Sequence, residues 1–115
     1  MRKDLYQVLG FARKAGLVSA GTMAAKTSLL RRRAHLLIMS GDISPRTRES
    51  LVSACEKYHV PWRVVGDKYR LGASVGKAYR VAVTVNDKGF AQTILELIDA
   101  EGNEANFTGV VEWRK

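Results

Sequence analysis

The sequence has a single cysteine, Cys55, and only two prolines among its 115 residues. One cysteine cannot form a disulfide within the chain, and it offers no framework for a metal site. No apolar run approaches the roughly 20 residues of a membrane-spanning helix. Charged residues interrupt the amino-terminal stretch too often for a signal peptide. We therefore expect neither a disulfide-stapled domain nor a membrane protein, and we predict a cytoplasmic location.

Acidic residues are scarce beside basic ones, with 11 Asp and Glu against 19 Lys and Arg and a formal net charge of +8. The composition otherwise fits an ordinary globular protein, because 46% of the residues are hydrophobic and 26% are charged. The excess of positive charge predicts a polyanionic partner, with nucleic acid ahead of an anionic membrane surface. A basic surface without a binding role is the alternative.

The hydrophobic pattern alternates between helical and extended segments. Leu5, Val8 and Leu9 have the spacing of a helix with one buried face. Residues 35–40 are almost continuously apolar, as in a strand that is covered on both faces. We predict helices at 4–15, 21–31, 45–58 and after Asp87, a helical turn at 67–71, and strands at 17–18, 35–40, 62–65 and 80–85.

This order of elements predicts an α/β sandwich around a mixed, mostly parallel sheet of about four strands. A chain of this length holds one domain with one core, and we assign that domain to residues 1–100. Residues 101–115 are predicted to be a C-terminal tail that is partly ordered at best, because chain ends are usually mobile unless they are tied down.

The stretch from residue 19 to residue 45 organises the rest of the chain. Gly21 and Thr22 begin the second predicted helix, whereas Asp42, Ile43 and Pro45 lie where the central strand leads into the third. If helix and strand run antiparallel, both segments meet at one end of the molecule. Helix N-termini there favour phosphates through their free N–H groups and positive dipole. The basic run at 31–33 either compensates a helix dipole or contacts phosphates.

A catalytic site is not evident, because the acidic residues are spread over caps and exposed positions rather than paired. Gly72 and Gly76 form neither a phosphate-binding loop nor a dinucleotide motif, so we predict no cofactor and no metal. The other candidates are better explained as caps (Asp42 and Asp87), a core residue (Cys55) and structural histidines (His35 and His59). We therefore expect a protein that is not an enzyme.

Several short motifs occur together in a fixed order. They are Gly21-Thr22, the strand at 36–39, Asp42-Ile43-Ser44-Pro45, Cys55-Glu56, Val60-Pro61-Trp62, Leu71-Gly72 and Gly76-Lys77. In this order and spacing the sequence resembles the kink-turn-binding family of ribosomal proteins over residues 4–99. It is most similar to the short bacterial branch of YlxQ-like proteins, through the segments LGFARKAGLVSAG and VAVTVNDKGFA. The resemblance implies a three-layer α-β-α sandwich that binds sharply bent RNA.

The resemblance also implies which residues contact the RNA. Gly21 and Thr22 present backbone amides, and Lys26 contacts a phosphate. Ile43 packs against an unstacked base, and Tyr79 stacks on another, a contact worth about 1–3 kcal/mol per base. The predicted RNA-binding residues are Gly21, Thr22, Met23, Lys26, Arg31, Arg33, Asp42, Ile43, Pro45, Lys77, Ala78, Tyr79 and Arg80, with Arg13, Lys14 and Arg32 extending the basic footprint.

The sequence departs from the family pattern at three positions of the second helix. Kink-turn readers usually carry an Asn-Glu pair after the glycine, where this chain has Met23 and Ala24, and the later family lysine aligns with Thr27. General RNA binding is therefore implied more strongly than kink-turn recognition. Binding through phosphates and shape predicts a strong dependence on salt.

Structured RNA, ribosomal or other, is the predicted partner, and ribosomal proteins or an RNA-modifying enzyme are further partners. Two alternatives use the same fold differently. One is a protein-interaction module whose docking element lies around Trp113. The other is a stand-alone RNA-recognition partner of a ribose methyltransferase.

Overall fold

A computed structural model describes residues 4–102 of the chain. The elements in chain order are α1 (Leu5–Lys14), β1 (Val18–Ala20), α2 (Thr22–Leu30), β2 (Leu36–Met39), α3 (Pro45–Tyr58), β3 (Trp62–Val64), α4 (Lys68–Ser74), β4 (Ala82–Val85) and α5 (Lys88–Gly102). α5 continues two residues past the predicted domain boundary. The rest of the predicted tail, with Trp113, lies outside the described residues.

The four strands form one sheet in the order β1-β4-β2-β3. β2 and β3 are parallel, whereas β4 runs antiparallel to both of its neighbours, β1 and β2. The predicted α/β sandwich with a mixed four-stranded sheet is confirmed. The expectation that the sheet is mostly parallel is wrong, because two of its three strand pairs are antiparallel.

The direction of β4 follows from the short segment before it. A parallel strand after β3 needs a crossover of a dozen or more residues that returns the chain to the far end of the sheet. α4 instead folds back beside the end that β3 has just reached, and the N–H of Arg80 donates to the carbonyl of Lys68 at 2.9 Å. β4 therefore begins beside the end of β2, with Ala82 opposite Met39, and runs in the reverse direction.

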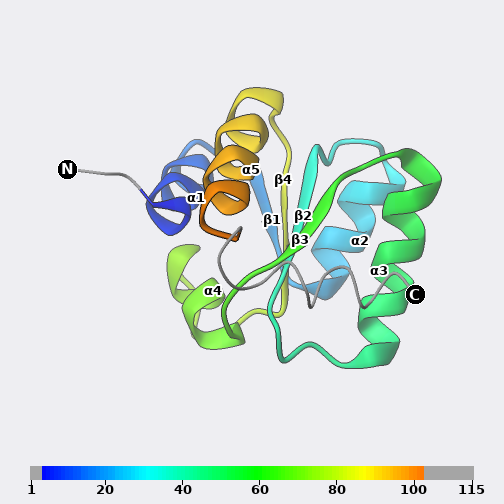
Figure 1. Ribbon diagram of the computed structural model, residues 1–115. Helices are drawn as coiled ribbons and strands as arrows, with labels where there is room; N and C mark the ends of the chain where they lie inside the picture. The colour runs from blue at the N-terminus through cyan, green and yellow to red at the C-terminus, as the bar shows by residue number, and fades with distance from the viewer. Residues whose placement is uncertain (1–3, 103–115) are drawn as a thin grey trace.

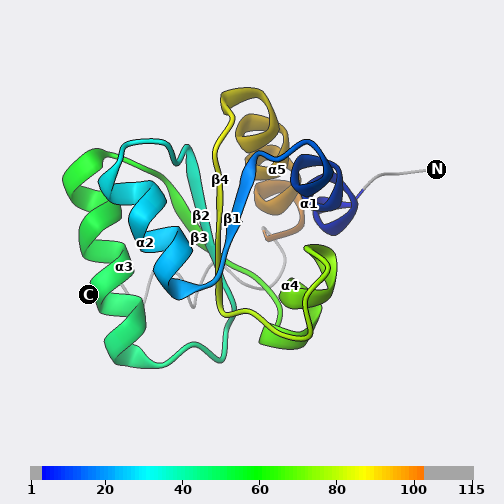
Figure 2. The same ribbon diagram turned by 180° about the vertical axis from the view of Figure 1, so that it is seen from behind.

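Helices cover both faces of the sheet, as Figures 1 and 2 show from opposite sides. α1, α4 and α5 lie on one face, and α2 and α3 lie on the other. Successive residues of β2 alternate between the two cores. Leu36 and Ile38 pack on the α1 side, and Leu37 and Met39 pack on the α2 side. The predicted three-layer α-β-α arrangement is therefore present.

Side-chain caps start most of the helices where the sequence places them. Asp4 forms a capping box on α1, Ser44 caps α3 and is followed by Pro45, and Asp67 caps α4. Asp87 accepts a hydrogen bond from the N–H of Phe90 at the start of α5. These local signals explain why the predicted and observed starts of these helices agree closely.

The buried residues of α2 are Ala25, Ser28 and Leu29, whereas Met23 is 83% exposed. The small residues let α2 approach its neighbours closely, and this packing fixes the helix rotation. α4 is longer than the predicted turn and includes Gly72, which was expected in a loop. None of the helices within residues 4–102 combines the length and apolar character needed to cross a bilayer.

Candidate nucleic-acid interface

Four chain segments meet around the first residues of β4. The N–H of Gly21, before α2, donates to the carbonyl of Ala82 at 2.8 Å, and the N–H of Ser40, after β2, donates to the carbonyl of Val81 at 3.0 Å. The N–H of Gly41 donates to the carbonyl of Gly66, after β3, at 2.8 Å. We call this end of the molecule the loop pole and define it as residues 21–24, 40–45, 66–69 and 75–81.

The N-terminus of α2 opens onto the loop pole without a side-chain cap. It is the exception among the helices of residues 4–102, since α1, α3, α4 and α5 each have a capping side chain. Its first turn holds no acidic residue, and Thr22, Met23 and Ala24 are exposed. Uncapped N–H groups at the positive end of a helix dipole attract anions such as phosphates. This end of α2 therefore suits contact with a phosphate backbone.

An exposed aromatic and basic cluster lies on the same pole. The rings of Tyr69 and Tyr79 are 61% and 55% exposed, and they meet edge to face with their centroids 6.5 Å apart. The amino group of Lys68 lies 5.3 Å from the Tyr69 ring centroid and 5.7 Å from that of Tyr79. Exposed rings beside a cation are the arrangement on which unpaired bases stack.

Gly72 allows the loop that carries Tyr79 to lie directly on α4. A Cβ atom at Gly72 would lie 2.5 Å from the Cα of Tyr79 and 2.8 Å from its nitrogen. Both distances are shorter than the contacts that Cβ atoms make in proteins. The N–H of Lys77 donates to the carbonyl of Gly72 at 2.9 Å, which fastens the same loop. The position of the Tyr79 ring therefore depends on the missing side chain of Gly72.

The two carboxylates of the loop pole accept hydrogen bonds from backbone N–H groups. Asp42 accepts from the N–H of Lys68 at 3.1 Å, and Asp67 accepts from those of Tyr69 and Arg70 at 2.9 and 2.8 Å. The neighbouring Ser40 hydroxyl and the N–H of Lys68 lower the pKa of Asp42. Both carboxylates thus order the start of α4.

The structure brings most of the predicted RNA-binding residues together at the loop pole. Arg80 lies over Gly21, with its Nε 3.5 Å from the place that a Cβ of the glycine would occupy. The predicted residues on the pole are Gly21, Thr22, Met23, Asp42, Ile43, Pro45, Lys77, Ala78, Tyr79 and Arg80.

Two of the predicted contact residues are engaged elsewhere. Ile43, which was expected to pack against an unstacked base, is only 5% exposed and packs in the core between α2 and α3. The buried Ile43 side chain therefore anchors the loop after β2 to this core. The amino group of Lys26 donates to the hydroxyl of Ser50 on α3, so this lysine links the two helices beside the pole.

The basic run at 31–33 does not belong to the loop pole. The N–H of His35 donates to the carbonyl of Val85, the last residue of β4, whereas the loop pole surrounds the first residues of that strand. α2 lies between them and spans about 13 Å. Arg31 and Arg33, which were predicted to share one footprint with the loops, therefore lie at the other end of the molecule because α2 is nearly as long as the sheet.

Sequence reasoning missed Lys68 and Tyr69 as candidate contacts. The segment at 67–71 was interpreted only as a capped turn, although it holds a lysine and a tyrosine, residue types that contact phosphates and stack on bases. Their place at the pole depends on the hydrogen bond from the N–H of Lys68 to Asp42, 26 residues earlier in the chain. A local sequence pattern cannot predict a hydrogen bond between residues that are so far apart in the chain.

The surroundings of the candidate catalytic cysteine and of the possible metal ligands fit structural roles. Cys55 is fully buried, and burial, with a smaller effect from Glu56, raises the pKa of its thiol to about 12. A thiol in that state is a poor nucleophile at neutral pH. Within residues 4–102, no group of three or more His, Cys, Asp or Glu side chains is placed to hold a metal ion.

Comparison with known protein families matches residues 3–95 to the model of the Ribosomal protein L7Ae/L30e/S12e/Gadd45 family. The chain belongs to this family. The match covers the elements from α1 into α5, and therefore the entire loop pole. It agrees with the family resemblance that the sequence motifs carry.

Two relatives support this assignment. The chain is 34% identical over 96 residues to RNA-binding protein YlxQ of Bacillus subtilis, covering 84% of this chain and 96% of the relative. It is 26% identical over 111 residues to large ribosomal subunit protein eL8 of Picrophilus torridus, covering 91% and 87% of the two chains.

Two solved structures share the fold of this family member. One is a Bacillus halodurans C protein with unknown function, which matches with a TM-score of 0.81 and 31% identity over 85% of this chain and 99% of that one. The other is a 15.5kD RNA binding protein of Giardia lamblia, with a TM-score of 0.72 and 20% identity over 84% and 82%. At that lower identity the likeness concerns the fold alone.

Proposed function

We propose that this protein binds structured RNA, ribosomal RNA first of all, through the loop pole, in the cytoplasm and without catalysing a reaction on it. The observation that carries the proposal is the meeting of four segments at the start of β4, with an uncapped helix N-terminus beside exposed tyrosines and a lysine. Family membership and the names of the relatives, which include an RNA-binding protein and a ribosomal protein, support it.

The two parts of the pole have different roles in this proposal. The N–H groups at the start of α2 and the side chains of Lys77 and Arg80 take the phosphates. The rings of Tyr69 and Tyr79 take an unpaired base that a bend in the RNA has exposed. Since most of these contacts involve backbone and charge, they select RNA shape more than base sequence.

Kink-turn RNA is the shape that the family resemblance suggests, but the pole lacks the polar pair on α2. Met23 and Ala24 are exposed where kink-turn readers present Asn and Glu to sheared G·A pairs. Neither side chain can accept or donate those hydrogen bonds. We therefore propose that this protein binds bent RNA with little dependence on the G·A pairs themselves.

The test compares two RNAs and two matched aromatic variants. A kink-turn RNA, and a second RNA with an internal loop of equal length but without G·A pairs, are titrated by fluorescence anisotropy. Tyr79→Ala is expected to weaken binding to both RNAs by about tenfold, because one base stack is lost. Phe11→Ala is the control, since Phe11 is exposed to a similar extent, 48%, on α1.

Equal affinities of wild type, Tyr79→Ala and Phe11→Ala for both RNAs would remove the loop pole from RNA binding. Loss of binding only when the G·A pairs are removed would show kink-turn recognition in place of general recognition of bent RNA. Partners that remain bound to the immobilised protein after ribonuclease treatment would favour the protein-interaction module.

A further inference from the structure

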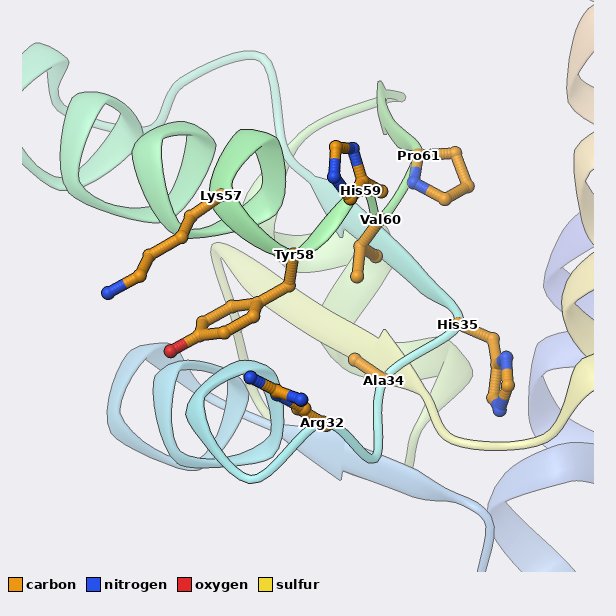
Figure 3. Close-up of a pocket in the computed structure, with 8 residues that line it drawn as sticks. All are labelled: Arg32, Ala34, His35, Lys57, Tyr58, His59, Val60 and Pro61. Atoms are coloured by element: carbon orange, nitrogen blue, oxygen red, sulfur yellow. The ribbon is translucent and has the colours of Figure 1, made fainter.

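A basic cleft lies at the end of the molecule opposite the loop pole. It has a volume of about 450 Å³ and opens between the turn that joins α2 to β2 and the turn that joins α3 to β3 (Figure 3). Ala34, Val60 and Pro61 give it an apolar surface, and the side chains of Arg32 and Lys57 stand beside it. We call it the turn cleft.

Positive charge gathers around an aromatic ring in the turn cleft. The guanidinium of Arg32 lies 5.3 Å from the ring centroid of Tyr58, and the amino group of Lys57 lies 5.4 Å from it. None of the described residues that line the cleft is acidic. Arg31 and Arg33, which are both exposed, flank Arg32 along the chain. The environment therefore favours an anionic ligand larger than the cleft itself.

The backbone at the turn cleft provides an independent observation. Arg32, with φ 59°, and His59, with φ 61°, are the two non-glycine residues within 4–102 that have positive φ. Each lies where a helix ends, a position at which glycine is most easily accommodated because it has no Cβ. Arg32 therefore carries a charged side chain at a position where the backbone itself favours glycine, and that side chain lies against the Tyr58 ring.

We propose that the turn cleft binds one nucleotide of a single-stranded RNA segment while the loop pole holds folded RNA. The base lies on Ala34, Val60 and Pro61, and the flanking phosphates meet Arg32, Lys57 and the neighbouring arginines. A cleft of this volume accepts one nucleotide unit, since small-ligand sites begin near 300 Å³. The inference goes beyond the proposed function because it assigns a second surface and makes the protein a bridge between two RNA segments.

The length of the positive surface favours an RNA strand over a free nucleotide. Arg31, Arg32 and Arg33 follow one another along the turn, so they offer contacts to more than one phosphate. A free nucleotide would fill the cleft and leave the outer arginines without a role. An RNA strand that crosses the cleft uses both groups, and its affinity depends steeply on salt.

The experiment measures binding of a fluorescent single-stranded oligouridine of about ten nucleotides. Arg32→Gly and Lys57→Ala are each expected to weaken its binding by about threefold to tenfold, because each removes a charge that meets a phosphate. The Arg32→Gly variant folds at least as well as wild type, since glycine suits positive φ, and its urea midpoint verifies this. Lys88→Ala is the control, because Lys88 is an exposed lysine on the first turn of α5 and lies outside both surfaces.

Separate titrations with the bent RNA distinguish the two proposals. Arg32→Gly is expected to weaken oligouridine binding more than bent-RNA binding, and Tyr79→Ala is expected to weaken bent-RNA binding more than oligouridine binding. Oligouridine binding that depends on Tyr79 and not on Arg32 would overturn the assignment of single-stranded RNA to the turn cleft. Failure of wild type to bind bent RNA, with oligouridine binding still dependent on Arg32, would remove the proposed function and keep this inference. Uridine monophosphate that binds as tightly as the oligonucleotide would overturn the assignment to an RNA strand.

Discussion

At the scale of single residues, the absence of a side chain at Gly72 allows the loop that carries Tyr79 to pack against α4. Gly72 sits in α4, where glycine is a poor helix former, yet its lack of a Cβ lets the backbone of Tyr79 approach within contact distance. At Gly21 the constraint is instead the backbone, because its φ of 111° is one that residues with a side chain rarely adopt. The arrangement of the loop pole therefore depends on two glycines, one for its missing Cβ and the other for its backbone conformation.

The first prediction concerns Gly72→Ala. The added methyl group meets backbone atoms of Tyr79, which cannot move without shifting the loop, so we expect destabilisation by about 1–3 kcal/mol. Bent-RNA binding is expected to weaken as well, because the Tyr79 ring moves. Urea unfolding and anisotropy titration measure the two effects.

Gly10→Ala is the matched control for this helix glycine. A Cβ at Gly10 would meet the carbonyl of Ser74 at an ordinary 3.4 Å. Alanine raises helix propensity there, so we expect stabilisation by up to about 1 kcal/mol. If Gly72→Ala is as stable as Gly10→Ala, the close approach of the loop to α4 is not required.

The second prediction concerns the buried thiol of Cys55 and alkaline pH. Its pKa is raised from the ordinary 9.0 to about 12, mainly by burial. Above pH 9 the unfolded chain loses the proton while the folded protein keeps it, so the stability supplied by this group falls as pH rises toward 12. The expected slope is about −1.4 kcal/mol per pH unit at its steepest.

The measurement is the free energy of unfolding of wild type minus that of Cys55→Ala, taken at several pH values. Subtracting the variant removes the titration of lysines and tyrosines, which the two proteins share. The difference is expected to be constant below pH 8 and to decline above pH 9. Parallel profiles up to pH 11 would show that the thiol ionises equally in both states.

At the scale of elements, Asn86 joins three of them just after β4. Its amide oxygen accepts from the hydroxyl of Ser28 on α2 at 2.6 Å, and its amide nitrogen donates to the hydroxyl of Ser19 on β1 at 2.9 Å. The N–H of Asn86 also donates to the carbonyl of Leu17 at 2.7 Å. One side chain thus fastens α2 to the strands β1 and β4.

The third prediction concerns Asn86→Ala. Ser28 is only 2% exposed, so its hydroxyl would be left buried without an acceptor. We expect destabilisation by about 1–3 kcal/mol in urea unfolding, because an unpaired buried hydroxyl is costly.

Two further variants test this explanation. Ser28→Ala combined with Asn86→Ala is expected to cost less than the sum of the single changes, since the unpaired hydroxyl is gone. Gln92→Ala, which breaks an exposed hydrogen bond to Glu96 on α5, is the control and is expected to change stability by less than about 0.5 kcal/mol. Strict additivity of the Ser28 and Asn86 variants would contradict the proposed network.

At the scale of the whole molecule, two groups of basic side chains lie at opposite ends. Lys68, Lys77 and Arg80 lie at the loop pole, whereas Arg32 and Lys57 lie at the turn cleft. α2 and α3 each run from one of these ends to the other. A single footprint would give one salt-dependent binding event. With two separate surfaces, the affinity of each RNA depends on salt through the basic residues of the surface that binds it.

The fourth prediction concerns this salt dependence. For the bent RNA, Lys68→Ala combined with Lys77→Ala is expected to reduce the slope of log K against log salt concentration by about 1.5–2, because each lysine that meets a phosphate releases roughly one counterion. The Lys88→Ala control is expected to leave the slope unchanged. A double variant with lower affinity but an unaltered slope would show that these lysines do not contact phosphates.

Local sequence signals determined where the helices begin and which short segments are strands. Ser44 before Pro45 starts α3, Asp4 starts α1, and the apolar run at 36–39 becomes a strand buried on both faces. Such signals act over about four residues through capping bonds and side-chain spacing, so they can be read from the chain alone. The motifs spaced along the chain likewise identified the family, which the comparison confirmed.

Only the tertiary structure decided which segments meet. The insertion of β4 between β1 and β2, the burial of Ile43 and the addition of Tyr69 to the loop pole all depend on contacts between residues far apart in the chain. The separation of Arg31 and Arg33 from the loop pole depends on the direction of α2 across the sheet. Strand order and helix rotation are set by long-range hydrogen bonds and core packing, which leave no local pattern in the sequence.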